Sequence, residues 1–407
     1  MRARRRLGPG TLCACLWQRV VGGSVCLVAS TACGIERAPT VSQRDSVGIQ
    51  IVESLAPDWK RRTGFRIRDA PLAEIGRGNR GGPYALYEVN DATLMPDGTV
   101  VIADGGSHEV RLFDARGTFL TAVGGRGEGP GEFLHLSSVE RYGGDSLAVL
   151  DRRQNRITIL GPALATARVF RPQTGAGRLR EVRPLDTPGF VALVAGEGGA
   201  ADRDGYYRPT YGVVRLTADG KMVARLAALP GLAGYASSGV VLSAPFAADA
   251  HIDVREDIVT IGSSDGLEFR QLEIDGEVLR IIRVLSLDFR LSVIAVERER
   301  AAIMEGMLPT YRKLVEDMVF PEHRPGYADL LVDSEGFIWT AEYQGRAEEA
   351  TAVAWHVFNP DGELLGKVEM PSRFEVFEIG DDYVLGKVDD ELGIEVVQIL
   401  GLERVSK

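Results

Sequence analysis

Histidine is the residue that most often holds a catalytic zinc, and this chain of 407 residues has five: His108, His135, His251, His323 and His356. A catalytic zinc usually needs three protein ligands that meet at one point. These histidines fall at different places within the repeats described below, so we do not expect three of them to converge. We therefore predict no metal site, no cofactor and no catalytic residue.

Three aspartates offer oxygen ligands that would suit a divalent cation: Asp104, Asp151 and Asp265. Asp104 and Asp151 occupy the same position in two successive repeats, each where a strand is expected to end. An aspartate at such a place can instead accept hydrogen bonds from the backbone amides of the following turn, and Asn155 can act in the same way. We favour this structural role over a cation site.

Arginine and tyrosine side chains in predicted loops form a candidate recognition site. The residues that we predict to bind a ligand are Arg126, Arg152, Tyr206, Tyr207, Arg208 and Arg324. Aromatic rings beside guanidinium groups suit stacking and the recognition of carboxylates or sugars. We expect all of these loops on one face, around the mouth of a channel, where several arginines would favour an anionic ligand. An ordinary solvated loop face is the alternative.

Charge and cysteine content exclude some functions. The formal net charge is -10 and the pI is near 5.2, which argues against a nucleic-acid partner because phosphate binding needs a basic surface. All four cysteines lie within the first 33 residues. Disulfides, thiolate catalysis and cysteine-bound zinc are therefore excluded from the rest of the chain.

The N-terminus has the pattern of a bacterial export signal. Five arginines precede or flank an uncharged, largely apolar stretch at 20–32, which is too short to span a bilayer comfortably. The sequence Ser30-Thr31-Ala32-Cys33 resembles a lipobox, although Ser30 stands where a leucine is usual. We predict a signal peptide at 1–33 with Cys33 lipidated, a polar tether at 34–47, and a location in the periplasm or on the outer surface. Plain secretion is the alternative.

Internal repeats predict the elements that would position these residues. Residues 95–133 contain an Asp97-Gly98 turn, two short apolar strands, a second turn and a last strand. The same order returns after residue 145, and the step from Asp104 to Asp151 is 47 residues, about one four-stranded propeller blade. The pattern predicts an all-β, six-bladed β-propeller over 48–407. Five or seven blades are alternatives, because residues 175–285 are divergent.

The two ends of the propeller are expected to close on each other. Residues 72–76 resemble the outer-strand ending at 121–124, whereas the C-terminus supplies only three strands. We therefore expect 66–76 to pair with 394–402 and complete the last blade. Residues 292–320 have a helical pattern and predict a helical insertion packed on the rim, with a moving lid as the alternative.

The stretch Gly-Arg-Gly-Glu-Gly-Pro-Gly-Glu-Phe at 125–133, within units 95–133 and 142–170, resembles NHL-type repeats. With its Cys33 leader, the chain is similar to six-bladed propeller proteins and predicted lipoproteins of environmental bacteria. This resemblance implies a fold and leaves the function open. We expect a non-catalytic binding or scaffold propeller, anchored to the membrane by lipid, whose ligand is a small molecule, a glycan or a protein. The alternative is a metal-dependent hydrolase or lyase of the lactonase type, which needs oxygen ligands from three or more blades to meet at the channel axis.

Overall fold

The computed structural model describes residues 41–55, 63–77, 81–175, 177–196, 204–237, 240–348, 350–390 and 392–404. The predicted signal peptide, Cys33 and residues 34–40 of the predicted tether lie outside the described residues.

Six antiparallel units of four strands, the blades, make up most of the described chain. Blades 1 to 3 are β4 (Val89–Leu94), β5 (Val100–Asp104), β6 (Glu109–Phe113), β7 (Phe119–Gly124); β8 (Leu136–Arg141), β9 (Leu147–Asp151), β10 (Arg156–Leu160), β11 (Thr166–Phe170); and β12 (Arg178–Pro184), β13 (Gly189–Ala195), β15 (Thr210–Thr217), β16 (Met222–Pro230). Blades 4 to 6 are β19 (Ala250–Arg255), β20 (Ile258–Ser263), β21 (Glu268–Leu272), β22 (Val278–Val284); β23 (Asp329–Val332), β24 (Ile338–Ala341), β25 (Ala352–Phe358), β26 (Leu364–Pro371); and β27 (Glu375–Ile379), β28 (Tyr383–Asp389), β29 (Glu395–Arg404), β3 (Phe65–Ile75).

The first strands of the blades lie around a common axis. Each contacts the first strand of the next blade, and the contact between β27 and β4 completes the ring. Six hydrophobic clusters fill the spaces between adjacent blades. The predicted six-bladed β-propeller is therefore confirmed, and we call β4, β8, β12, β19, β23 and β27 the inner strands.

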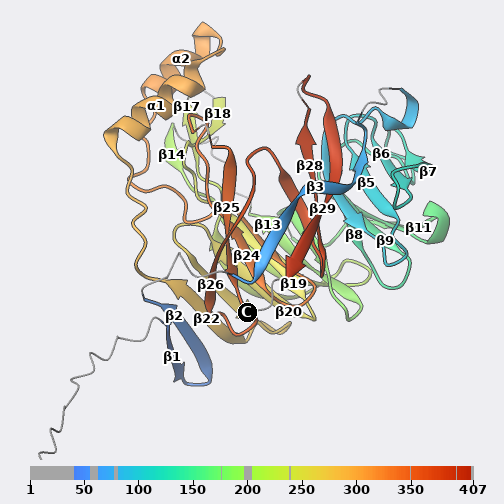
Figure 1. The fold of residues 1–407 in the computed structure, drawn as a ribbon, viewed down its shortest axis with the longest axis horizontal. Coiled ribbons are helices and arrows are strands. Elements are labelled where there is room, and N and C mark those ends of the chain that lie inside the picture. Colours follow the sequence, from blue (N-terminus) through green and yellow to red (C-terminus); the bar gives the residue numbers. More distant parts are fainter. Residues whose placement is uncertain are drawn as a thin grey trace, which may run out of the picture. The chain divides into compact units, whose positions relative to one another are not determined.

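The predicted closure of the ring is also confirmed. Strand β3 pairs antiparallel with β29, with Ile75 opposite Val397 and Ile67 opposite Leu402. Figure 1 shows β3, coloured blue, beside the red strand β29. Ile75 is 1% exposed and packs in the cluster between blades 6 and 1, so the closing strand contributes to the core.

A hairpin precedes the closing strand. It consists of β1 (Val41–Ser46) and β2 (Ile49–Ser54), and β2 pairs in parallel with β22, the outer strand of blade 4. The part of the predicted tether that the structure describes, residues 41–47, is thus built into this hairpin. Ile51 and Val52 are buried there, so two apolar side chains hold the hairpin against the blade.

Buried arginines hold the loops that join one blade to the next, which we call connectors. In blade 1 the Arg111 guanidinium donates to the carbonyls of Pro83 at 3.0 Å and Ala85 at 2.8 Å. In blade 2 Arg156 donates to the Glu128 carbonyl at 2.8 Å. The glycine-rich stretch 125–133 is therefore a connector whose carbonyls are bound by a buried cation.

Two helices and a small sheet are added to this ring. The helices are α1 (Val293–Met304) and α2 (Pro309–Glu316), and the sheet contains β14 (Gly205–Tyr207), β17 (Gly234–Ser237) and β18 (Val240–Ser243). Glu299 of α1 is 2% exposed and accepts the backbone N–H groups of Arg346 and Ala347 at 3.1 and 3.0 Å. A buried carboxylate therefore fastens the insertion to the loop between β24 and β25, which supports a packed insertion rather than a free lid.

Replacing Glu299 with alanine should loosen this insertion. The substitution leaves two N–H groups without their acceptor, at a cost of about 2 kcal/mol. Hydrogen exchange over 292–320 should then be about 30-fold faster while the blades keep their protection. Glu297→Ala is the matched control, because the Glu297 side chain is 65% exposed on the same helix. Equal exchange in both variants would contradict the anchoring role.

Candidate functional site

Two cavities lie along the propeller axis, and together we call them the axial channel. One cavity, of about 380 Å³, lies at the C-terminal ends of the inner strands, beside the turns that lead to the second strand of each blade. We call it the hairpin-side cavity. All six inner strands contribute residues to its wall. The connector-side cavity, about 200 Å³, lies nearer their beginnings, where the connectors enter. The two walls share Asp91, Arg183, Leu331 and Phe377, so the cavities are neighbours along one path.

Four inner strands carry a β-bulge at the same level of the channel. In each, the pairing register shifts by one residue, so that two successive residues of the inner strand stand opposite one residue of the neighbouring strand. The bulged pairs are Asn90–Asp91, Ser137–Ser138, Arg180–Glu181 and Phe377–Glu378. A bulge redirects side chains that regular alternation would send to the other face. As a result, polar residues gather at the axis while the apolar residues on both sides of each pair stay in the core.

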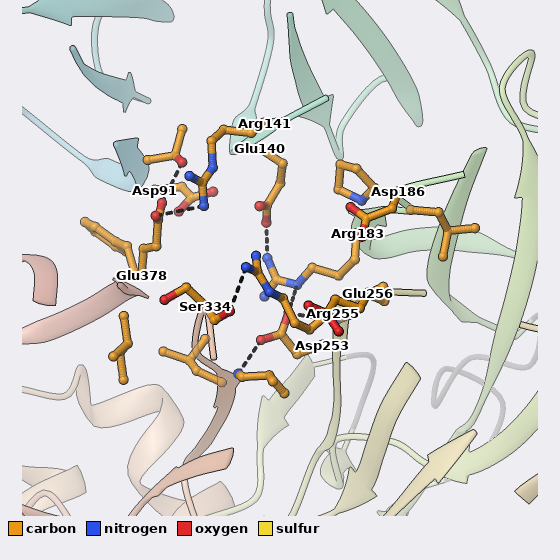
Figure 2. Close-up of a pocket in the computed structure, with 18 of the residues that line it drawn as sticks. Asp91, Glu140, Arg141, Arg183, Asp186, Asp253, Arg255, Glu256, Ser334 and Glu378 are labelled. Atoms are coloured by element: carbon orange, nitrogen blue, oxygen red, sulfur yellow. Dashed lines mark hydrogen bonds and ion pairs between the residues drawn. The ribbon is translucent and has the colours of Figure 1, made fainter. Parts of the chain in front are cut away.

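Charged side chains in the channel link one blade to the next. The Val139 N–H of blade 2 donates to Asp91 of blade 1 at 2.9 Å. Arg183 of blade 3 then donates to Glu140 of blade 2 and lies 3.5 Å from the Asp253 carboxylate of blade 4. Arg183 is thus held between two carboxylates from two neighbouring blades, as Figure 2 shows.

The same chain of contacts continues around the ring. Asp253 accepts the Val332 N–H of blade 5 at 2.6 Å, and Ser334 of blade 5 donates to Asp381 of blade 6. Glu378 of blade 6 accepts the Thr93 hydroxyl of blade 1 at 2.6 Å. Polar contacts therefore join all six blades around the channel, and each contact includes at least one residue of the channel wall. We call this set the polar belt.

Burial sets the protonation of the polar belt. It raises the pKa of Glu140 and of Asp253, and it raises that of Asp91, where the nearby Glu140 adds to the effect. Burial opposes the charge on Arg183, but the surrounding carboxylates, Glu140 first, outweigh it and raise the pKa of the guanidinium. Arg183 is the permanent cation that these carboxylates need.

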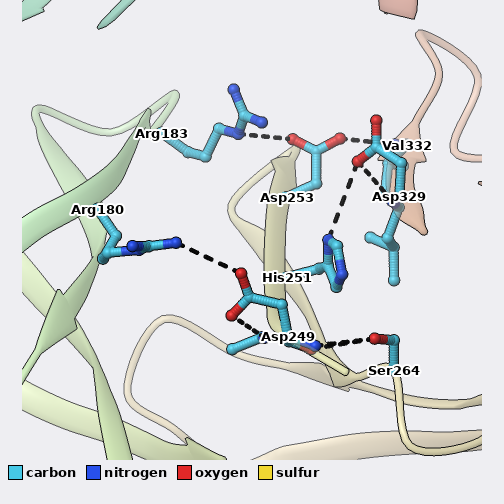
Figure 3. Close-up of polar contacts among 10 residues, drawn as sticks. Arg180, Arg183, Asp249, His251, Asp253, Ser264, Asp329 and Val332 are labelled. Atoms are coloured by element: carbon cyan, nitrogen blue, oxygen red, sulfur yellow. Dashed lines mark hydrogen bonds and ion pairs between the residues drawn. The ribbon is translucent and has the colours of Figure 1, made fainter. Parts of the chain in front are cut away.

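A second set of charges surrounds the connector-side cavity. Arg180 lies 3.4 Å from Asp249 and 5.2 Å from the centre of the Tyr211 ring. His251 Nδ1 lies 4.0 Å from the Asp329 carboxylate, as Figure 3 shows. Burial lowers the pKa of His251 to about 4 and raises that of Asp329 to about 6, so the imidazole is neutral at pH 7.

Two charged groups of this cavity have no hydrogen-bond or ion-pair partner in the described part of the chain. Arg152, in the turn between β9 and β10, and Glu181, in the bulge of β12, both line the cavity. Among the described residues, neither side chain makes a hydrogen bond or an ion pair. Burial raises the pKa of Glu181 to about 7; the nearby Arg183 opposes the shift, and Asp329 and Asp249 add to it. Sequence reasoning selected Arg152 and missed Glu181.

Three of the predicted site residues meet elsewhere. Tyr206, Arg208 and Arg324 line a separate cavity of about 300 Å³. The Arg208 guanidinium binds Asp265 at 2.5 Å, and that of Arg324 binds Glu348 at 3.2 Å. Both arginines of this cavity are therefore already neutralised by carboxylates of the protein.

The remaining predicted residues are dispersed. Tyr207 pairs with Gly234 in the small sheet, and Arg126 is an exposed connector residue opposite Phe133. Neither of them lines the axial channel or the cavity of Tyr206. Arg152 is the one residue of the predicted set that the structure places in the channel wall.

The structural role favoured for two aspartates is confirmed. Asp104 accepts the Ser107 N–H at 3.1 Å, and Asp151 accepts the Gln154 N–H at 2.9 Å, each across a turn. Within the described chain, one group of three carboxylates comes close enough for a shared cation: Glu273, Asp275 and Glu277. This group is exposed on the turn between β21 and β22 and belongs to neither channel cavity.

Comparison with known proteins agrees with the architecture. A family model described as a 6-bladed beta-propeller matches residues 90–159, and no curated protein matches the chain. A predicted exported protein from Bacteroides fragilis has a similar structure, with a TM-score of 0.51, 12% identity, and coverage of 88% of this chain and 100% of that one.

Two further structures are less similar. A member of the DUF4221 family from Bacteroides vulgatus has a TM-score of 0.47 and 9% identity over 84% of this chain and 99% of that one. Virginiamycin B lyase from Staphylococcus aureus has a TM-score of 0.41 and 9% identity over 82% and 99%. At such identities the comparisons bear on the fold alone. In the described part of the chain, no helix has the length and apolar character needed to cross a membrane.

Proposed function

We propose that this protein is a non-catalytic binding propeller of the bacterial cell envelope, and that its ligand is a small charged molecule held in the connector-side cavity. The observation that carries the proposal is the pair of unpartnered charges there, Arg152 and Glu181. Glu181 is half-buried, so leaving its carboxylate unpaired costs free energy that a ligand of matching charge recovers. Arg152 is exposed at the cavity wall, where its guanidinium can pair with a ligand.

The rest of the channel supports binding rather than catalysis. The charges of the polar belt are occupied with one another and with backbone amides, and Arg183 takes the central position. A metal-dependent reaction of the lactonase type would place carboxylates around a cation at this point, where the guanidinium already serves as the cation. The belt therefore forms a fixed wall behind the site.

The binding role predicts that one arginine matters and its neighbour does not. Arg152→Gln should weaken binding about ten-fold or more, because a charge-assisted hydrogen bond is lost. Arg153→Gln is the control, with the same change of charge one residue away and outside the cavity wall. Calorimetry would compare both variants with wild type, using putrescine, citrate, glycine betaine, glucose and single amino acids. The proposal is contradicted if every probe binds both variants equally and none of them loses affinity in Glu181→Gln.

The envelope location rests on the N-terminal signal and on Cys33. Cys33→Ser should move the protein from the membrane fraction to the soluble exported fraction, because the thiol is the site of lipidation. Labelled fatty acid should be incorporated into wild type and absent from the variant. Cys26→Ser is the control, since it removes a thiol within the apolar stretch and leaves the lipobox-like sequence intact. Equal labelling of Cys33→Ser and wild type would count against lipid anchoring.

A further inference from the structure

The two unpartnered groups of the connector-side cavity carry opposite charges. Arg152 lies close enough to Glu181 for the two charges to affect each other, yet they form no ion pair. Their neighbours behave differently: Arg180 is paired with Asp249, and Arg183 is paired with Glu140. A cation and an anion thus line one small cavity without pairing with each other.

Charges of both signs lie near each group. Glu181 has the Arg183 and Arg180 guanidinium groups as well as the Asp329 and Asp249 carboxylates nearby. Arg152 has Arg180 nearby in addition to Glu181. The Asp329 carboxylate accepts one hydrogen bond, from the Leu330 N–H at 2.8 Å, and so keeps further lone pairs for a donor.

The size and the remaining wall of the cavity limit the ligand. Its volume of about 200 Å³ is below the roughly 300–1,000 Å³ of sites for drug-sized molecules. Leu150, Leu331 and Phe377 add an apolar part to the wall. A ligand with one charge would satisfy one group and leave the other unpaired, whereas a ligand with both charges satisfies both.

We infer that the connector-side cavity binds a small zwitterion, an amino acid or a short peptide with free termini, whose ammonium group contacts Glu181 and whose carboxylate contacts Arg152. This inference rests on the proposed function, which requires only a charged ligand in the same cavity. The bulge of β12 is the structural device that makes the site, because it turns both Arg180 and Glu181 to the channel.

Titration calorimetry at pH 8 tests the inference, with each of the twenty L-amino acids and glycylglycine as separate probes. The tightest probe is then compared with its amide, which lacks the negative charge, and its N-acetyl derivative, which lacks the positive charge. We expect the zwitterion to bind at least about ten-fold more tightly than either derivative. Arg152→Gln should remove the preference over the amide, and Glu181→Gln the preference over the N-acetyl form. Arg153→Gln should change neither preference.

Two results would overturn the inference. If the amide binds as tightly as the parent and depends on Glu181, the ligand is a simple cation; the proposed function then stands and the zwitterion does not. If no amino acid and no glycylglycine binds, the zwitterion is likewise excluded. The proposed function fails separately, when the wider set of cations, anions and sugars also shows no binding that depends on Arg152 or on Glu181. Circular dichroism of each variant would verify that it is folded.

Discussion

Replacing Arg183 with methionine is expected to lower the free energy of unfolding by about 3 to 5 kcal/mol. Arg183 is the cation between Glu140 and Asp253, and its removal leaves both carboxylates in the channel wall without their counter-charge. Methionine keeps the length of the side chain, so the effect reports on charge rather than on lost packing. Urea denaturation at pH 7.5 would measure it.

Arg141→Met is the matched control for this substitution. Arg141 also pairs with a channel carboxylate, Glu378, at 3.0 Å, but its side chain is 39% exposed. Glu378 keeps hydrogen bonds from Thr93 and Tyr383 in that variant, so the expected loss is about 1 kcal/mol or less. A loss of the same size in both variants would mean that Arg183 stabilises the polar belt no more than the more exposed Arg141 does.

The pH dependence of the Arg183→Met variant offers a further test. Without the guanidinium, the pKa values of Glu140 and Asp253 should rise above their already raised values. A carboxyl whose folded pKa is raised stabilises the fold at low pH and loses that contribution as the pH rises through the folded pKa. The difference between variant and wild type should therefore shrink as the pH falls from 7.5 to 5. The double variant Arg183→Met with Glu140→Gln should recover part of the loss at pH 7.5.

The blades could be predicted from the sequence because their signals are local. Asp97-Gly98 marks a hairpin turn in which Gly98 has a φ of 86°, a conformation that favours glycine. Closure was predictable for a similar reason, since residues 72–76 repeat the ending of another outer strand. In the divergent region 175–285 the structure has two further blades, one of β12, β13, β15 and β16 and one of β19 to β22, and the small sheet of β14, β17 and β18. The repeat of about 47 residues was therefore sufficient to predict the six-bladed architecture.

The channel could not be predicted in the same way, because its contacts are long-range and its strands are irregular. Arg183 and Glu140 are 43 positions apart in the chain. Likewise, nothing local to Arg208 or Arg324 reveals that Asp265 and Glu348 neutralise them. The loop positions therefore predicted four arginines, of which Arg208 and Arg324 are paired with carboxylates, and did not predict Glu181, which lies on a strand.

A sequence signal for the bulges does exist. Each bulged pair stands between two buried apolar residues spaced by three positions, as in Val89 and Ala92 or Leu179 and Val182. A regular strand would space them by two. The spacing recurs in four of the six repeats and marks the residues that reach the axis. Reading it as a bulge would have added Glu181 to the candidate site.

Glu181→Gln is expected to stabilise the protein at alkaline pH. The native pKa of Glu181 is about 7 because burial disfavours its charge, whereas a glutamate in an unfolded chain titrates at about 4.3. The native state therefore holds the proton more tightly, and the wild type loses stability as the pH rises from about 4.5 to about 7. Glutamine carries no charge to bury, so the variant should be more stable by about 2 to 3 kcal/mol at pH 8 and by about 1 kcal/mol or less at pH 5.

Urea denaturation of wild type and Glu181→Gln at pH 5 and pH 8 would measure this gain. Glu277→Gln is the control, because it removes the same charge from an exposed turn outside the channel and should leave both values unchanged within error. A gain of equal size at both pH values would show that the benefit does not come from the ionisation of Glu181. The expected outcome also connects stability to binding: a native protein that keeps an unfavourable carboxylate at the channel axis gives up stability that a bound ammonium group would restore.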